Sequence, residues 1–187
     1  MRRDKTRIFD EYLAAAARVG DREAFGRLAE RWQPRLLRHA YRLIGDGEAA
    51  RDIVQDAWAD IAKGLPSLMD ASVFPAWAYR IVTRRAADSI RKAQRRRRTS
   101  DAFAAEPAVE AHSAAVMEQS INAAPLSAAI AALPPDQRVV IALFYQDEFS
   151  VAEIAAALEV PAGTVKTRLM HARKKLRATL EGESKDE

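Results

Sequence analysis

Apolar residues recur every three or four positions through most of the chain, and no stretch shows the strict alternation of a half-buried strand. In the first half this spacing predicts four helices, with core residues within 9–16, 25–44, 53–65 and 74–90. Pro34 is expected to kink the second of these or to begin a new segment. In the second half it predicts four more, within 126–133, 139–144, 154–158 and 165–176. The fold class predicted is all-α.

Residues from about 99 to 125 interrupt this pattern with a segment rich in Ala, Ser, Glu and Pro. Its weak periodicity predicts a flexible linker with at most a transient helical turn near 114–121. The chain is therefore expected to consist of two small helical domains, at 1–98 and 126–187, joined by a linker at 99–125.

The second domain carries the pattern of a helix-turn-helix. Ser150 and Glu153 have the spacing of a capping box at the start of a short helix. A turn at 159–163, which includes Gly163, leads into a final helix that is basic. Two short helices joined by a tight turn, the second one basic, are typical of this DNA-binding motif.

The net charge of +4 is unevenly distributed. Residues 80–98 hold nine basic residues and one acid, whereas 99–125 hold four acids and no Lys or Arg. A second basic stretch at 160–180 has six basic residues and no acid. Two separate basic surfaces favour a polyanion such as nucleic acid over a small acidic substrate.

Several classes of protein are disfavoured by what the 187 residues lack. There is no Cys for a disulfide or a thiolate site, and no apolar run of the ~18 residues that a membrane span needs. The chain is expected to be cytoplasmic, with no membrane insertion of its own. The three His lie in different segments, and no phosphate-binding loop or nucleophile elbow is present. We expect no enzyme activity, metal or cofactor.

Three acids of the third predicted helix form a column, because Asp52, Asp56 and Asp60 follow one another at intervals of four. Only Lys63 and Arg51 lie near enough in sequence to neutralise them. The column is either an ordinary solvated face or a docking face for a basic partner. A metal site is the weakest alternative, because all three acids come from one helix.

The fourth predicted helix combines arginines with aromatic residues. Such a combination suits contacts with phosphates and stacking on unpaired bases. The alternative is that the aromatic residues are core and the arginines only solubilise the helix end. The preceding loop, 65–73, is a candidate for base contacts. The candidate DNA-binding residues of the helix are Phe74, Trp77, Tyr79, Arg80, Arg84 and Arg91.

The final helix has an exposed basic face beside its apolar stripe. In a helix-turn-helix the first turns of this helix enter the major groove, where Lys and Arg can bond to guanine edges. The candidate residues for duplex DNA are Thr164, Lys166, Thr167, Arg168, Met170, His171, Arg173 and Lys174.

These residues resemble a known family, the extracytoplasmic-function (ECF) sigma factors of bacterial RNA polymerase. The resemblance to their conserved region two lies in Tyr41-Arg42-Leu43-Ile44-Gly45, Asp52-Ile53-Val54-Gln55-Asp56 and Phe74-Pro75-Ala76-Trp77-Ala78-Tyr79-Arg80-Ile81. The resemblance to region four lies in Leu133-Pro134-Pro135-Asp136-Gln137-Arg138, Ser150-Val151-Ala152-Glu153-Ile154-Ala155 and Gly163-Thr164-Val165-Lys166-Thr167-Arg168. It covers nearly the whole chain outside the linker and the extreme ends.

The resemblance implies a role for each surface. The acidic helix, through Asp52, Gln55, Asp56 and Asp60, would bind core RNA polymerase. The loop 65–73 and the fourth helix would recognise and melt the downstream promoter element, and the final helix would read the upstream element. Polymerase would supply the catalysis and its magnesium. A typical member is held inactive by an anti-sigma factor and serves a specific, often stress-related regulon.

The chain departs from the family pattern at two places that bear on promoter choice. Thr83-Arg84 stands where many members have Arg-Asn, and His171 stands where an Arg is common. Two alternatives remain at this stage. One is an ordinary helix-turn-helix regulator, which would leave the acidic column and the first basic block unexplained. The other is a sigma-like decoy that sequesters an anti-sigma factor.

Overall fold

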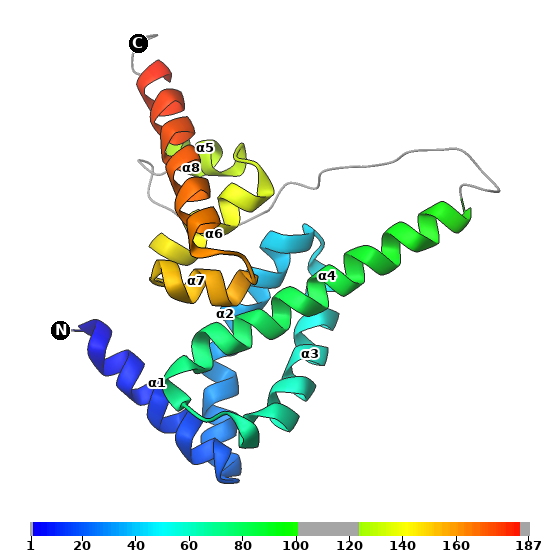
Figure 1. Ribbon diagram of the computed structural model, residues 1–187, viewed down its shortest axis with the longest axis vertical. Helices are drawn as coiled ribbons and strands as arrows, with labels where there is room; N and C mark the ends of the chain where they lie inside the picture. Colours follow the sequence, from blue (N-terminus) through cyan, green and yellow to red (C-terminus); the bar gives the residue numbers. More distant parts are fainter. Residues whose placement is uncertain (1, 101–123, 184–187) are drawn as a thin grey trace. The chain divides into compact units, whose positions relative to one another are not determined.

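The computed structural model describes residues 2–100 and 124–183, and within them every regular element is helical (Figure 1). The predicted all-α class is confirmed for these residues. The chain divides into two units, one containing helices α1–α4 and the other containing α5–α8. Nearly all of the predicted linker lies outside the described residues. None of the described helices is long and apolar enough to cross a membrane.

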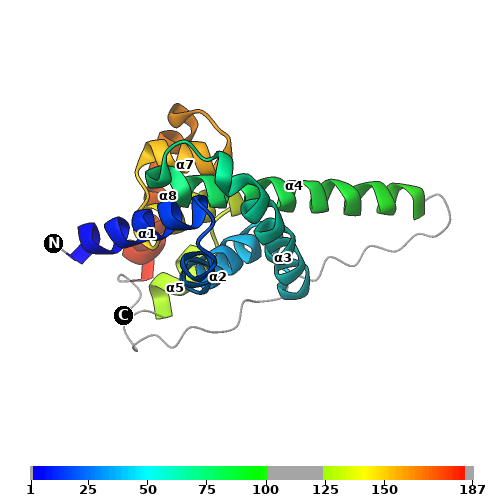
Figure 2. The same cartoon turned by 90° about the horizontal axis from the view of Figure 1, so that it is seen from below.

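The first unit is a bundle of α1 (Arg2–Arg18), α2 (Arg22–Ile44), α3 (Gly47–Gly64) and α4 (Phe74–Ser100). Helix α2 packs against each of the other three, and α3 also packs against α4. The later turns of α4 extend past the rest of the unit, and residues 91–96 are all exposed (Figures 1 and 2). Helix α2 runs through Pro34 as one element, so no new segment begins there.

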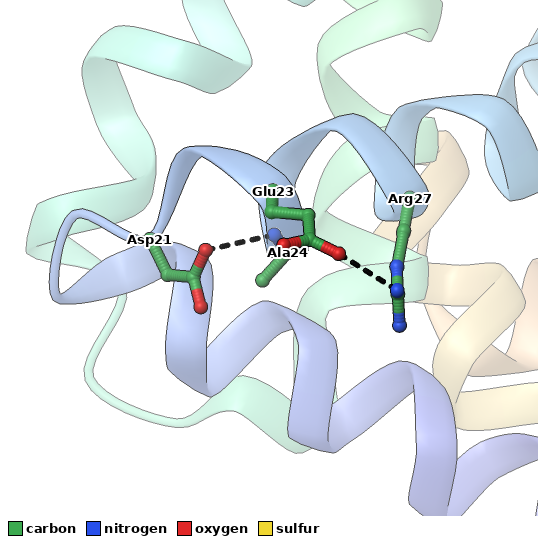
Figure 3. Close-up of polar contacts among 4 residues, drawn as sticks. All are labelled: Asp21, Glu23, Ala24 and Arg27. Carbon is green, nitrogen blue, oxygen red and sulfur yellow. Dashed lines mark hydrogen bonds and ion pairs between the residues drawn. The ribbon is translucent and has the colours of Figure 1, made fainter.

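The helices of the first unit are joined by tight turns with capped ends. Gly20, at a φ of 101°, ends the turn after α1, and the side chain of Asp21 then accepts a hydrogen bond of 3.0 Å from the Ala24 amide (Figure 3). Gly45 ends α2 in the left-handed conformation. The side chain of Asp46 then caps α3 as Asp21 caps α2, by accepting a hydrogen bond from the Ala49 amide. Such caps satisfy amides that the helix leaves without a partner, and each contributes about 1 kcal/mol.

The core of the first unit is built around Trp32, which is 2% exposed. Its indole meets the rings of Phe74 and Tyr79 edge-on, with centroids 5.7 and 6.1 Å away. Leu28 and Leu36 lie on the same buried face of α2. Each fully buried side chain of this kind contributes about 1.5–3 kcal/mol. The aromatic cluster therefore joins α2 to the start of α4.

His39 of α2 is also fully buried. Its Nε2 lies 2.9 Å from the Thr83 hydroxyl, and this hydroxyl donates its own hydrogen to the carbonyl of Tyr79. The imidazole must therefore donate from Nε2, and, because the ring is buried, it is neutral with its one proton on that nitrogen. Burial, assisted by the positive charge of Arg42, lowers the pKa of His39 to about 3.

The second unit contains α5 (Ala124–Ala131), α6 (Pro135–Tyr145), α7 (Val151–Leu158) and α8 (Ala162–Glu183). Helix α8 packs against the other three. Its buried residues Val165, Leu169 and Ala172 are those of the predicted apolar stripe, whereas Leu176 is half-buried. The predicted capping box is confirmed, because the Ser150 hydroxyl accepts from the Glu153 amide and the Glu153 carboxylate accepts from the Ser150 amide.

The turn between α7 and α8 does not use its glycine. Glu159 takes the left-handed conformation after α7, with a φ of 55°, while Gly163 lies in the first turn of α8. A residue with a Cβ is strained in this conformation, where Gly is the usual choice. The predicted turn at 159–163 is therefore shorter in the structure, because α8 already begins at Ala162.

The buried His39 predicts a loss of stability in acid. The unfolded chain takes up a proton near pH 6.5, whereas the folded chain resists protonation down to about pH 3. The free energy of unfolding should therefore fall by about 1.4 kcal/mol per pH unit between these values. Denaturant titrations between about pH 7.5 and 5 should give a flatter pH dependence for His39→Gln than for the wild type. The exposed His171→Gln is the control and should keep the wild-type slope; equal slopes for all three proteins would contradict the prediction.

Candidate nucleic-acid interface and acidic docking face

Helix α3 presents an acidic face to solvent. Asp52, Gln55 and Asp56 are exposed, while their neighbours Ile53, Val54 and Ala57 are buried against the bundle. The alternation follows from the helical period, which turns residues four apart to the same side. We call Asp52, Gln55 and Asp56 the acidic face.

The fourth predicted member of this face, Asp60, is half-buried and paired with a residue of α4. Arg85 of α4 binds its carboxylate at 2.6 Å and lies 3.6 Å from Asp56. The hydrogen bond to Asp60, opposed by desolvation and reinforced by the nearby carboxylates, raises the pKa of Arg85. The Asp60 side chain is 37% exposed, and its carboxylate is already paired with Arg85. From the sequence, Arg51 was one of two residues expected to neutralise the acidic column, but it pairs with Glu48.

The first basic surface lies along α4, and two of its predicted DNA-binding residues require correction. Phe74 and Tyr79 are both 0% exposed, because their rings form the cluster with Trp32. They position α4 and have no surface to offer to DNA in this conformation. Trp77 is half-buried. The predicted residues that α4 does expose are Arg80, Arg84 and Arg91.

The loop before α4 contains two short 3₁₀ turns, η1 (Leu65–Ser67) and η2 (Ala71–Val73). Both ends of the loop are clamped. Leu65 and Phe74 are buried, and the ring of Trp77 packs so tightly over Gly64 that a Cβ there would lie 2.9 Å from it. Between these ends Met69 is 93% exposed. The loop is therefore a short projection before the basic helix, held at both ends.

The second basic surface lies on α8, where most of the predicted residues are exposed. The predicted side chains on this face, apart from Arg168 and Arg173, are the half-buried Thr164 and the exposed Lys166, Thr167, Met170, His171 and Lys174. Helix α7 packs against α8 behind this face, as a helix-turn-helix requires.

Arg168 and Arg173 are engaged within the second unit. Arg168 forms an ion pair of 3.2 Å with Asp136 of α6. Arg173 donates from Nε to the Tyr145 hydroxyl at 3.0 Å, and its guanidinium lies over the rings of Phe144 and Tyr145. These contacts hold both guanidinium groups in fixed places at the edges of the exposed face. They were not expected from the sequence, because the partners lie about thirty residues away.

Among the described residues, no cluster of His, Asp and Glu is arranged to hold a metal ion. His39 is buried in the first unit and His171 is exposed in the second. His112 lies outside the described residues.

In comparison with known proteins, both units match models of Sigma-70 regions. Residues 28–96 match the family model described as Sigma-70 region 2, and residues 123–176 match that described as Sigma-70, region 4. Two solved structures are similar to the chain. One is the sigma factor RpoE in complex with the anti-sigma factor NepR from Bartonella quintana, with 27% identity, a TM-score of 0.65 and coverage of 84% of this chain and 96% of that one. The other is CnrH in complex with the cytosolic domain of CnrY, with 26% identity, a TM-score of 0.62 and coverage of 93% and 98%.

Curated relatives extend the match along the chain. The ECF RNA polymerase sigma factor SigW of Bacillus subtilis (strain 168) is 32% identical over 170 residues, which are 86% of this chain and 91% of that protein. The ECF RNA polymerase sigma-E factor of Escherichia coli (strain K12) is 31% identical over 176 residues, or 89% and 91%. Together with the two matched regions, these relatives confirm the resemblance found in the sequence: the chain belongs to the ECF RNA polymerase sigma factors.

Proposed function

We propose that this chain binds bacterial core RNA polymerase and directs it to promoters through two separate DNA contacts. A sigma factor is a transcription initiation factor and not an enzyme, so the polymerase carries out the chemistry. One observation carries the proposal: a single chain joins an exposed acidic face to two basic surfaces, each in its own unit and each within a matched sigma region. An ordinary helix-turn-helix regulator has no use for the acidic face.

The acidic face is the proposed contact with core polymerase. Asp52, Gln55 and Asp56 project from one side of α3 and are available to a basic partner surface. Complementary charges of this kind speed association and fix its orientation. Asp60 contributes indirectly, because its pairing with Arg85 holds α3 against α4.

The loop 65–73 and α4 are the proposed contact with the downstream promoter element. Exposed arginines along α4 supply contacts with phosphates, and the exposed Met69 in the loop supplies an apolar surface for an unstacked base. The half-buried Trp77 lies at the base of the same loop. Loop and helix together suit DNA that is being separated into single strands.

The exposed face of α8 is the proposed contact with the upstream element in duplex form. Lys166, Thr167 and Met170 lie in the first turns of the helix, where a helix-turn-helix reads base edges. Arg168 and Arg173 are suited to contacts at the edges of the groove, since Asp136 and Tyr145 hold them there.

The proposed control is by an anti-sigma factor that covers these surfaces, and the proposed setting is a cytoplasmic, stress-related regulon. Support comes from the similar solved structure of the sigma factor RpoE, which is in complex with the anti-sigma factor NepR. The same surfaces that bind polymerase and DNA would be the ones that a protein inhibitor must compete for.

Run-off transcription on fragmented genomic DNA tests the proposal. Core polymerase free of sigma factors would be assayed with and without the chain, and the transcript starts would be sequenced. We expect discrete new starts that share two spaced upstream elements. Absence of both new starts and core binding would contradict the proposal and favour the ordinary regulator or the decoy.

Reversing the charge of the acidic face should weaken polymerase binding. Asp56→Arg removes one exposed ion pair, so the free energy of unfolding should change by only about 1 kcal/mol or less. Its affinity for core polymerase, measured by fluorescence anisotropy, should fall by about tenfold or more. Glu23→Arg is the matched control, because it makes the same charge change and also breaks an exposed ion pair, with Arg27 on α2. Equal losses of affinity for the two variants would rule out a specific docking role for the acidic face.

Two variants of α8 separate the reading of bases from general electrostatic attraction to DNA. Lys166→Ala should weaken binding of the upstream element by about 1–3 kcal/mol and relax the preference at one base pair. Arg177→Ala removes an equal charge three turns later on the same helix, from an exposed residue paired with Glu181. This control should leave base preference unchanged. Transcription from a promoter library with randomised upstream elements measures both variants, and an unchanged preference for Lys166→Ala would refute its assignment.

A further inference from the structure

The middle of the loop 65–73 is held by a residue that lies fifty positions earlier in the chain. Arg18, in the last turn of α1, donates from Nη1 to two successive backbone carbonyls, those of Leu68 at 3.1 Å and Met69 at 2.9 Å. Helix α1 also packs against both η1 and η2. Without Arg18 the clamps at Gly64, Leu65 and Phe74 would fix only the two ends of the loop.

The contact leaves the Met69 side chain pointing away from its anchored backbone. The carbonyl of Met69 is bonded to Arg18, while its side chain is 93% exposed. The next residue, Asp70, accepts a hydrogen bond of 2.8 Å from the Ser72 amide, and the hydrogen bonds from Ser72 lower the pKa of this carboxyl. The backbone is thus held on both sides of Met69, and its thioether side chain is exposed to a ligand.

A single exposed apolar side chain is ordinary on a protein surface. Met69 differs in that its own backbone carbonyl is held by Arg18 while its side chain stays exposed. Methionine suits contact with a base, because its flexible, polarisable side chain packs well against flat π surfaces. Residues of this kind also act as wedges between base steps in proteins that distort DNA.

We propose that Arg18 is a positioning residue for promoter recognition, which fixes the loop so that Met69 is presented to an unstacked base of the downstream element. The inference rests on the proposed function. Arg18 itself does not touch DNA; it acts through the two carbonyls. A fixed loop binds at a lower entropic cost, and it discriminates between bases because it cannot rearrange to accommodate the wrong one.

An arginine is needed for this contact. Its terminal nitrogen carries two hydrogens in a fixed plane and can reach two carbonyls at once, whereas a lysine is a compact charge on a flexible stem. Because the acceptors are backbone carbonyls, the contact does not depend on which side chains the loop carries. The same anchor therefore serves any base preference that the loop side chains encode.

The test compares Arg18→Gln with Arg18→Lys and with a matched control, Arg27→Gln. Arg27 is an exposed arginine of the same unit whose ion pair with Glu23 is visible in Figure 3. Each full-length variant is assayed for thermal unfolding, core polymerase binding and transcription from promoters with each base substituted in the downstream element. Hydrogen exchange of the amides of residues 65–73 reports loop mobility directly.

For Arg18→Gln we expect faster exchange in the loop and about a tenfold loss of discrimination between the preferred base and its substitutes. Core binding should stay at the wild-type level. The discrimination and loop exchange of Arg18→Lys should lie between those of Arg18→Gln and the wild type. Arg27→Gln should match the wild type. A loss of activity spread equally over all promoters would show a structural role only, and unchanged discrimination by Arg18→Gln would overturn the inference.

A double-mutant cycle with Met69→Ala checks that Arg18 acts through the loop. If Arg18 serves to present Met69, then Met69→Ala should lower discrimination in the wild type and have little further effect in Arg18→Gln. Fully additive losses would overturn the inference while leaving the proposed function intact. A wild-type chain that directs no promoter-specific start would overturn the proposed function first, and this inference with it.

Discussion

The packing of Trp32 against Phe74 and Tyr79 determines what the first unit can present to a partner. It fixes the rotation of α4 about its own axis, because two residues of that helix must face the indole. With this face turned inward, the helical period turns Arg80, Arg84 and Arg91 outward. The same contact places the end of the loop 65–73, since Phe74 follows it directly. One apolar cluster therefore orients a charged surface without being part of it.

The spacing of apolar residues was enough to predict the helices, the helix-turn-helix and the exposed faces of α3 and α8. Local patterns also sufficed for the capping box at Ser150, because both of its residues lie within one turn. Prediction failed where a contact joins distant segments. The pairing of Asp60 with Arg85 depends on how α3 and α4 pack, and the anchoring of Met69 by Arg18 depends on α1. Phe74 and Tyr79 were wrongly predicted to contact DNA, because an aromatic residue in a basic helix suits base stacking and core packing equally well.

A common principle links the two basic surfaces, although they belong to separate units. In each, groups near the proposed DNA contacts are already held by neighbours: Arg168 by Asp136, Arg173 by Tyr145, and the backbone at Met69 by Arg18. Groups that are fixed before binding lose less freedom on binding, and they favour selectivity because they cannot move to suit a different sequence. Exposed charges such as Lys166 and Lys174 add attraction that falls as salt rises.

The close contact between Gly64 and Trp77 bears on how this chain can evolve. Gly64 has a φ of −87°, which any residue can adopt, so its constraint is purely steric and lies in the opposing ring. Gly20 and Gly45, at 101° and 75°, are constrained by their own backbone. A harmful substitution at position 64 is therefore open to second-site suppression by a smaller side chain at position 77. Lesions at positions 20 and 45 have no such single partner that could restore them. Substitutions at Gly64 would thus be expected to co-vary with position 77, whereas Gly20 and Gly45 would be constrained independently of any one partner.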